Sequence, residues 1–325
     1  MDGRRLTLRQ EYSLGIDVGS VSTNFVLVDG SGEVRYKLYL RTEGRPIEAL
    51  IKGMSDVADF LQPGDKIVAA GTTGSGRRLA AAMVNADIIK NEITAHAAAA
   101  CAVEPGVKTI IEIGGQDSKI IILDNGIPCD FAMNTVCAAG TGSFLDRQAA
   151  RLNIPIEEFG SYALRSKSPV RIAGRCAVFA ESDMIHKQQM GHPLEDIIAG
   201  LCEALVRNYL NNLAKGKKIL APVLFQGGVA ANVGIVAAFK KYLGTDLIIP
   251  KYYDVMGAYG VALLARENVK ANGGKTGFLG VDCVNRDFRA RSIECSGCSN
   301  MCEVICILSD GKQVAHWGDK CGKYA

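Results

Sequence analysis

The sequence lacks a strong charge imbalance, a long apolar run and an apolar N-terminal segment. The formal net charge is only +3 in 325 residues, which is too small to predict binding to nucleic acid or to an anionic membrane. No stretch approaches the roughly 18 consecutive apolar residues of a membrane-spanning helix. Residues 1–11 are charged and do not resemble a secretion signal. We therefore expect a cytoplasmic protein without nucleic-acid or membrane partners.

Length and cysteine content set two further expectations. Single hydrophobic cores stop growing at roughly 250–300 residues, so a longer chain predicts two domains. The eleven cysteines are not expected to form disulfides in a reducing compartment, so those at informative spacings are candidate metal ligands or reactive thiols. We interpret most isolated cysteines, Cys101, Cys129 and Cys202 among them, as small buried apolar residues.

Two segments of the chain repeat one another 95 residues apart. Residues 16–20 read IDVGS and residues 111–115 read IEIGG. Each ends an apolar strand and is followed by a turn and a second strand, at 24–28 and 119–123, so each predicts a β-hairpin. The glycines let backbone amides approach a bound group closely, as a phosphate-binding loop requires.

A third glycine turn occurs later in the chain. Residues 223–230 read VLFQGGVA, an apolar strand followed by a turn that opens a helix to about residue 241. The free N–H groups at a helix start suit a phosphate or a nucleotide edge. Two Ala-rich helices are predicted at 91–102 and 253–266, where links between two halves are expected.

Any one of these turns is compatible with an ordinary tight turn, but three in this order resemble the acetate and sugar kinase, Hsp70 and actin superfamily. The resemblance implies an α/β, actin-like ATPase fold of two duplicated domains with ATP or ADP between them. It assigns the first phosphate loop to Gly19, Ser20, Ser22 and Thr23, the second to Gly114, Gly115 and Ser118, and the adenosine loop to Gly227, Gly228 and Val229.

Three side chains beside these loops are candidate catalytic residues. The resemblance implies that Asp17 organises Mg²⁺ through water. Magnesium keeps several waters and takes one or two carboxylates, so Asp117 is a second candidate. Gln116 is a candidate for orienting the attacking water, as a glutamine does in some GTPases. The alternative for Gln116 and Asp117 is loop capping by polar side chains.

Two cysteines are predicted at helix starts. Cys137 opens the segment CAAGTGSFLD, ahead of a helix to about residue 152, and Cys176 opens CAVFAES, ahead of a helix ending near residue 190. A helix N-terminus favours negative charge by about 0.3–1 kcal/mol and so favours a thiolate, which binds metals or performs redox chemistry. An iron–sulfur cluster ordinarily takes four cysteines, so a twofold dimer would supply the other two. The alternative is two unrelated buried cysteines.

These segments, together with GIDVGS at 15–20 and IGGQDSK at 113–119, closely resemble the activator components of 2-hydroxyacyl-CoA dehydratases and the ATPase subunits of benzoyl-CoA reductase. The resemblance spans about residues 13–268. It implies a homodimer that holds one 4Fe–4S cluster through Cys137 and Cys176 of each subunit. It further implies that ATP hydrolysis drives a low-potential electron from a ferredoxin or flavodoxin, through the cluster, to a partner iron–sulfur enzyme. That partner is a dehydratase, a benzoyl-CoA reductase or a double-cubane cluster protein.

The predicted domains are residues 13–90 with 252–268, residues 91–251 with the cluster cysteines, and a Cys-rich extension at 269–325. In the extension, Cys295, Cys298, Cys302 and Cys321 are expected to form one four-thiolate site for zinc or a second iron–sulfur cluster, with Cys306 as an alternative fourth ligand. A module of about 50 residues needs such a staple to be stable, so a separate metal-binding module is predicted. Free thiols are the alternative.

Two other functions remain open at this point. The phosphate loops of the superfamily also serve transfer to sugars and acids, so a small-molecule kinase is one alternative. The other is an ATP-sensing regulatory protein. Neither needs two cysteines at helix starts.

Overall fold

A computed structural model of the chain describes residues 9–134 and 137–323, so of the charged N-terminal segment only residues 9–11 are described. The chain forms two compact units. Unit 1 comprises residues up to 95 and from 257, and unit 2 comprises residues 96–256. The chain crosses between them within α3 (Glu92–Val103) and at the start of α9 (Met256–Ala271). The two Ala-rich helices predicted from the sequence are therefore confirmed.

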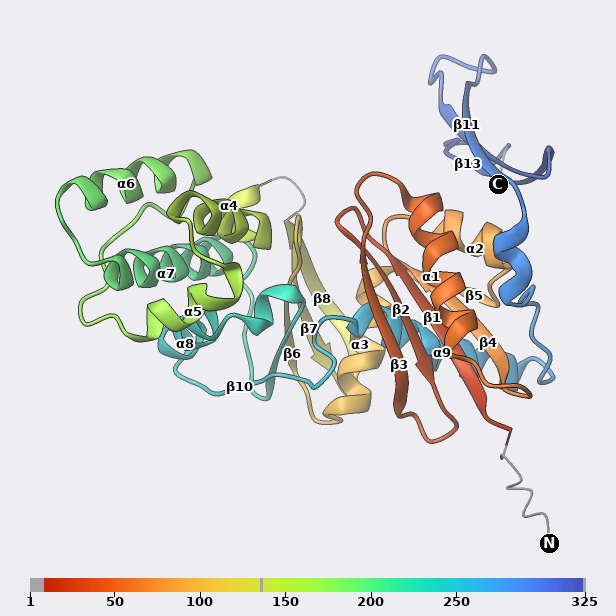
Figure 1. Ribbon diagram of the computed structural model, residues 1–325, viewed down its shortest axis with the longest axis horizontal. Coiled ribbons are helices and arrows are strands. Elements are labelled where there is room, and N and C mark those ends of the chain that lie inside the picture. The colour runs from red at the N-terminus through yellow and green to blue at the C-terminus, as the bar shows by residue number, and fades with distance from the viewer. Residues whose placement is uncertain (1–8, 135–136, 324–325) are drawn as a thin grey trace, which may run out of the picture. The chain divides into compact units, whose positions relative to one another are not determined.

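Each unit holds a five-stranded sheet with equivalent strand order (Figure 1). The order is β3-β2-β1-β4-β5 in unit 1 and β8-β7-β6-β9-β10 in unit 2. In each sheet the first three strands are antiparallel and the others join in parallel. The strands are β1 (Glu11–Val18), β2 (Ser22–Val28), β3 (Val34–Arg41), β4 (Lys66–Thr73), β5 (Ile88–Ile89), β6 (Thr109–Ile113), β7 (Ser118–Asp124), β8 (Ile127–Asn134), β9 (Val223–Gln226) and β10 (Leu247–Ile248).

The internal repeat and both predicted hairpins are confirmed at the level of strand register. Ile16 pairs with Phe25 in unit 1, and the residues 95 positions later, Ile111 and Ile120, pair in unit 2. The next pairs are Asp17 with Asn24 and Glu112 with Lys119. The duplication therefore places Glu112 at the position that corresponds to Asp17.

Unit 1 has helices on both faces of its sheet. Successive side chains of a strand point to opposite faces, so Leu14 and Ile16 enter the core with α1 (Pro46–Phe60) and α2 (Arg77–Val84). On the other face α9 packs so closely that a Cβ added at Gly15 would overlap the carbonyl oxygen of Ala258. Glycine is required at position 15 because of this close approach.

Unit 2 carries α3 on one face of its sheet and the other helices on the opposite face (Figure 1). The second layer buries a core of aliphatic and aromatic side chains in which Phe239 packs edge-on against Tyr209 and Phe225. The helices of this layer are α4 (Gly142–Leu152), α5 (Ile156–Leu164), α6 (Ala177–Gln189), α7 (Leu194–Asn212) and α8 (Val233–Leu243). All of them except α8 lie in the chain between β8 and β9.

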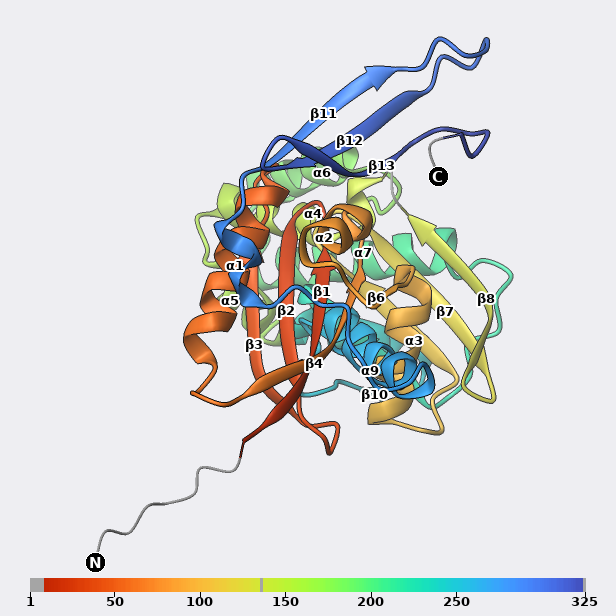
Figure 2. The ribbon, with the colours of Figure 1, turned by 90° about the vertical axis from the view of Figure 1, so that its right-hand side faces the viewer.

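The C-terminal extension forms a three-stranded antiparallel sheet (Figure 2), made of β11 (Phe288–Glu294), β12 (Glu303–Ser309) and β13 (Lys312–Trp317). Three of its side chains, Cys283, Phe288 and Ile307, belong to the apolar core of unit 1. A smaller cluster around Val304 lies within the extension itself. The extension is therefore anchored in unit 1 and is not self-contained, which differs from the separate module predicted.

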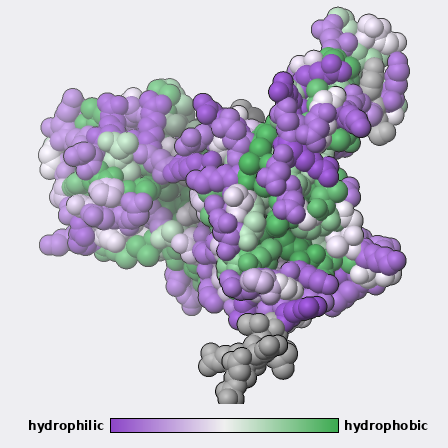
Figure 3. Space-filling model, turned by 45° about the vertical axis from the view of Figure 1, so that its right-hand side comes forward, coloured by the Kyte–Doolittle hydropathy of each residue, from purple (hydrophilic) through white to green (hydrophobic). Residues whose placement is uncertain are grey.

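Hydrophilic residues cover much of the visible surface (Figure 3). Within residues 9–134 and 137–323, no helix is both long and apolar enough to cross a bilayer.

Candidate functional site

The first glycine turn, between β1 and β2, is held by hydrogen bonds from two sides. The Gly19 amide donates to the Ser22 carbonyl at 2.8 Å. Thr42, which follows β3, donates its hydroxyl to the Gly19 carbonyl at 3.0 Å and pairs with the Thr23 hydroxyl at 2.9 Å. Ser20, at the tip, is exposed. The turn is thus rigidly placed, with its tip open to a ligand.

Asp17, at the end of β1, faces a further glycine turn, at residues 74–76, that was not predicted from the sequence. Gly74 has φ +88°, and a Cβ added there would lie 2.5 Å from Asp17 Oδ1. The Gly76 amide and the Ser75 hydroxyl donate to the Val18 carbonyl at 2.8 and 3.2 Å. The signal was available, because residues 74–76 read GSG directly after a buried strand.

The second predicted phosphate turn lies between β6 and β7 in unit 2. The Gly114 amide donates to the Asp117 carbonyl at 3.0 Å. Gln116 is exposed at the tip, and Ser118 is buried. The hydroxyl of Ser118 has no hydrogen-bond partner among the described residues, and the same is true of Thr73 at the end of β4 in unit 1. Each unit therefore carries an unused buried hydroxyl at the end of a strand that borders a glycine turn.

A buried lysine under the second turn was also not predicted from the sequence. Lys119 Nζ lies 3.0 Å from Glu112 Oε2 and 2.7 Å from Asp117 Oδ2, and its side chain is 3% exposed. A buried cation needs such partners. Asp117, a predicted magnesium carboxylate, thus forms an ion pair with Lys119. The repeat was the available signal, since it aligns Glu112 with Asp17.

Two further buried polar residues lie near this ion pair. His96 on α3 makes a 2.7 Å hydrogen bond to the Gln226 side chain at the end of β9. Burial lowers the pKa of His96 to about 3, and the charge of Lys119 acts in the same direction. His96 is therefore neutral at neutral pH and does not add charge beneath the glycine turns.

The third glycine turn requires glycine at its first position only. Gly227 has φ +88°, and an added Cβ would overlap the Ile113 carbonyl oxygen and lie 2.8 Å from Glu112 Oε1. A Cβ at Gly228 would meet open space. Val229, next in the turn, is buried.

The helix predicted to open at this turn begins later and runs to residue 243. A 3₁₀ turn occupies Gly228–Ala231, and α8 starts at Val233. Asn232 sets the start, because its side chain accepts from the amides of Gly234 and Ile235 at 3.0 and 3.1 Å.

Cys137 lies at a helical N-terminus, but it caps a 3₁₀ turn and not α4, which ends at Leu152 as predicted. The 3₁₀ turn is Ala138–Gly140, and α4 begins only at Gly142. The reason is local, since the side chain of Asn134 holds the backbone of Cys137. This side chain accepts from the Cys137 amide at 2.9 Å and donates to the Cys137 carbonyl at 2.7 Å. Cys137 itself is half-buried.

Cys176 is the residue that caps α6, as predicted, and it is half-buried. Among the described residues, no side chain caps the free amides at this helix start, and the first turn holds no acidic residue. These amides are therefore open to a negatively charged group.

Asn208 on α7 lies between the two cysteine-bearing segments and bonds to one of them. Its side-chain amide donates to the Gly174 carbonyl at 2.5 Å, two residues before Cys176. On the other side, a Cβ added at Gly140 would lie 2.8 Å from Asn208 Oδ1. No sequence motif marks this residue, which is 2% exposed.

The second glycine turn is also joined to the cysteine segment. At the start of α4, the Gly142 amide donates to the Gly114 carbonyl and the Ser143 amide to the Gly115 carbonyl, both at 2.8 Å. The Ser143 hydroxyl donates to the same Gly115 carbonyl. The predicted phosphate turn and the segment that carries Cys137 are therefore linked by hydrogen bonds within unit 2.

The four cysteines predicted to form the thiolate site lie around the β11–β12 turn and near residue 321. Cys295 is buried, and Cys302 is half-buried and accepts from the Cys295 amide at 2.8 Å through its carbonyl. Cys298 and Cys321 are exposed. In the part of the chain that the structure describes, no three His, Cys, Asp or Glu side chains are grouped to hold a metal. The four-thiolate site stays a prediction.

The isolated cysteines differ from one another. Cys202 is buried as predicted, Cys101 is half-buried and Cys129 is exposed. The interpretation of Cys129 as buried is wrong, because it lies on β8, an edge strand of the unit 2 sheet.

Two duplicated units, each with a glycine turn between its first two strands, define the class of actin-like ATPases, and the predicted fold is confirmed. The chain belongs to the BadF/BadG/BcrA/BcrD ATPase family, whose model matches residues 14–265. The family match does not include the extension.

Relatives of known role match over most of their own length. The chain is 35% identical to the 2-hydroxyisocaproyl-CoA dehydratase activator of Clostridioides difficile, over 80% of this chain and 96% of the relative. It is 34% identical to the (R)-2-hydroxyglutaryl-CoA dehydratase activating ATPase of Acidaminococcus fermentans, over 78% and 96%. A benzoyl-CoA reductase subunit of Thauera aromatica is 26% identical over 77% and 91%.

A solved structure agrees with these relatives. The activator of the 2-hydroxyisocaproyl-CoA dehydratase from Clostridium difficile, with bound ADPNP, superposes with a TM-score of 0.72 at 33% identity, over 80% of this chain and 96% of that one. The ethanolamine utilization protein EutJ from Carboxydothermus hydrogenoformans, at 18% identity and a TM-score of 0.52, shares the fold alone.

Proposed function

We propose that this chain is an ATP-dependent activator that uses hydrolysis to pass a low-potential electron to a partner iron–sulfur enzyme. The observation that carries the proposal is the pair of backbone hydrogen bonds from Gly142 and Ser143 to Gly114 and Gly115. Through these bonds, a movement of the Gly114–Gly115 turn on phosphate binding would displace the segment that carries Cys137. Nucleotide drives a change only if it interacts differently with two arrangements of the protein, and this link is where the difference is transmitted.

Nucleotide binding is supported by the residues around the three glycine turns. The unused hydroxyls of Thr73 and Ser118 fit the need of phosphate oxygens for donors. Asp17, at the end of β1 and facing the glycine turn of residues 74–76, is the carboxylate we assign to hydrated Mg²⁺. Gln116, exposed at its turn, is assigned to orient the attacking water.

A shared cluster is supported by the two cysteine segments. Cys137 and Cys176 are half-buried thiols on segments that approach Asn208 from two sides, and the open amides of α6 suit an anionic group. A 4Fe–4S cluster bound by both cysteines of two subunits supplies one-electron redox chemistry. Val178, in the first turn of α6, is 68% exposed, and a homodimer interface at this helix would cover it.

The partners are inferred from the relatives. The dehydratase activators and the reductase subunit suggest a dehydratase, a benzoyl-CoA reductase or a double-cubane cluster protein as the electron acceptor, and a ferredoxin or flavodoxin as the donor. For the extension we retain one four-thiolate site of Cys295, Cys298, Cys302 and Cys321, holding zinc or a second cluster.

Iron content and ATP hydrolysis test this assignment together. Anaerobically purified protein should contain about four irons per dimer from the shared site, and Cys137→Ser and Cys176→Ser should each remove them. Asp17→Asn should lower ATP hydrolysis by about 10²-fold or more while leaving the iron bound, because the two sites lie on different elements. Iron analysis and a phosphate-release assay measure both.

Two matched variants control for general damage. Cys129→Ser changes an exposed cysteine of unit 2 and should retain the iron. Asp59→Asn changes an exposed carboxylate on α1 and should retain hydrolysis. The proposal fails if both cluster-cysteine variants keep the full iron content, or if Asp17→Asn hydrolyses ATP at the normal rate. Iron that remains in both cysteine variants would belong to the extension.

A further inference from the structure

A large open cleft lies within unit 2, beside Cys176. It has a volume of about 1310 Å³ and is lined by residues 171–175, by α6 and by the C-terminal half of α7 with the residues after it. All of these belong to one compact unit, so the cleft is a feature of that unit alone. The wall formed by residues 171–175 ends at the residue before Cys176.

The cleft is strongly basic. The cationic or basic side chains among its lining residues are Arg171, Arg175, His186, Lys187, Arg207 and Lys215. Arg171, Arg175, Lys187 and Lys215 have no carboxylate partner in the part of the chain that the structure describes. Like charges held close together without partners repel one another, so the arrangement favours an acidic occupant.

The acidic group in the lining is used to build the wall. Asp183 on α6 accepts from the Ala173 amide at 2.8 Å. Arg207 on α7 donates to the Ile172 carbonyl at 2.7 Å, and Asn208 holds the next-but-one residue, Gly174. The segment before Cys176 is thus fixed from two helices, and the cleft is formed before any occupant arrives.

We propose that this cleft is the docking site of a small acidic electron-carrier protein, which delivers the electron that the activator later passes on. This inference rests on the proposed function. In the step, the reduced carrier would lose one electron, and a cluster held by Cys137 and Cys176 would accept it. No proton or bond change is required of the residues in the cleft.

Charge and exposure argue for a partner that binds only transiently. A donor must bind, transfer one electron and leave in every cycle, and such electron-transfer encounters use small interfaces that complementary charge steers. Exposed cations on long side chains serve this purpose, since they speed association without holding the partner tightly. Phe179, which is 65% exposed and lines the cleft, supplies an apolar contact close to Cys176.

A charge-reversal variant tests the docking site. Arg171→Glu with Lys187→Glu reverses two unpaired cations and leaves Arg175, Arg207 and Asn208 in place. With an oxidised acidic 2[4Fe–4S] ferredoxin as the probe, calorimetry at low salt should show binding to the normal dimer. The dissociation constant should rise at least about tenfold in the variant, and cluster reduction by reduced ferredoxin should slow, whereas reduction by dithionite should not.

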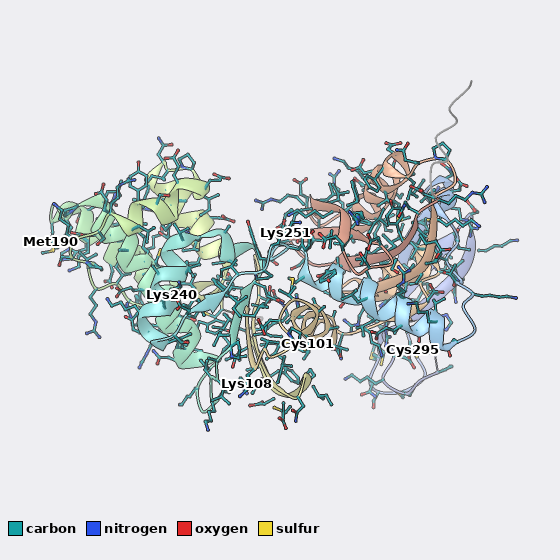
Figure 4. The ribbon with its side chains drawn as sticks, turned by 90° about the horizontal axis from the view of Figure 1, so that it is seen from below. Cys101, Lys108, Met190, Lys240, Lys251 and Cys295 are labelled. Carbon is teal, nitrogen blue, oxygen red and sulfur yellow. The ribbon has the colours of Figure 1, made fainter. Side chains whose placement is uncertain are left out.

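Lys108→Glu with Lys218→Glu is the control, because it makes the same change in net charge at exposed lysines of unit 2 outside the cleft. Lys108 lies far along the unit from Met190, the residue after α6 (Figure 4). The control should bind ferredoxin within about twofold of the normal protein. Equal weakening in both variants, or in neither, would overturn the docking site.

Three other outcomes also decide the question. If ferredoxin does not bind, but inorganic phosphate binds to the normal protein and not to the cleft variant, the cleft is a small-anion site and the docking proposal is overturned. A cleft variant that is monomeric while the control is dimeric would show that the cleft is a subunit interface. Salt-sensitive ferredoxin binding that depends on Arg171 and Lys187 in a protein without any iron would support the docking site and contradict the proposed function.

Discussion

At the scale of residues, the packing of the two cysteine segments requires glycine at position 140. An added Cβ would lie 2.8 Å from Asn208 Oδ1 and 3.2 Å from Asn134 Nδ2, and these two asparagines hold the segments of Cys176 and Cys137. We predict that Gly140→Ala loses most of the bound iron and about 1–3 kcal/mol of stability, as overpacked sites do. Iron analysis and thermal unfolding measure the two effects.

Gly228→Ala is the matched control, because its added Cβ would meet open space. It should keep both the iron and the melting temperature. If Gly140→Ala behaves like this control, the asparagines do not organise the cysteine segments.

The glycines, Asp17 and the two cysteines were recognisable from the sequence because they stand in motifs with fixed spacing. Asn208 was not, because it acts from the middle of a long helix and is close to the cysteine segments only in the folded chain. Lys119 was close to recognition. It pairs in the sheet with Glu112, and Glu112 is the residue that the repeat aligns with Asp17. The burial of Lys119, however, is not visible in a single sequence.

At the scale of elements, the extension is tied to unit 1 through β11. Phe288 is 8% exposed and packs in the core of that unit, whereas Arg291 on the same strand is exposed. We predict that Phe288→Ala costs about 3–5 kcal/mol and lowers the melting temperature, because it opens a cavity in a core that includes β1. Arg291→Ala should change stability by less than about 0.5 kcal/mol.

Thermal unfolding of both variants settles this point. Equal melting temperatures in Phe288→Ala and Arg291→Ala would mean that the extension folds by itself. The sequence predicted that outcome because the extension has few apolar residues. It could not show that a core elsewhere in the chain supplies the missing contacts.

The helix starts show the same limit. Cys176 was correctly placed at the start of α6, but α4 begins five residues after Cys137. The hydrogen bonds from the Asn134 side chain to Cys137 and the 3₁₀ turn at Ala138–Gly140 delay the start of α4. Such short-range hydrogen bonds compete with a helix, and the period alone does not reveal them.

At the scale of the whole molecule, the two units share a sheet but differ in the connection after its third strand. Unit 1 has one helix between β3 and β4, whereas unit 2 has α4, α5, α6 and α7 between β8 and β9. Cys137 and Cys176, the two cysteines proposed to bind the cluster, lie in this longer connection. We infer that one half of a duplicated ATPase carries the redox site, joined to its own glycine turn through Ser143.

The central claim is that nucleotide bound at the glycine turns changes the energy of an electron at the cysteine site. It is tested most directly by the midpoint potential of the cluster, measured by EPR-monitored titration with and without ADPNP and Mg²⁺. The account predicts a nucleotide-dependent shift in the normal protein and a smaller shift in Ser143→Ala, which removes the hydroxyl bond to Gly115. Because coupling is reciprocal, reduction of the cluster should change nucleotide affinity by the same factor. A potential that ADPNP does not move, in protein that binds both nucleotide and cluster, would contradict the account.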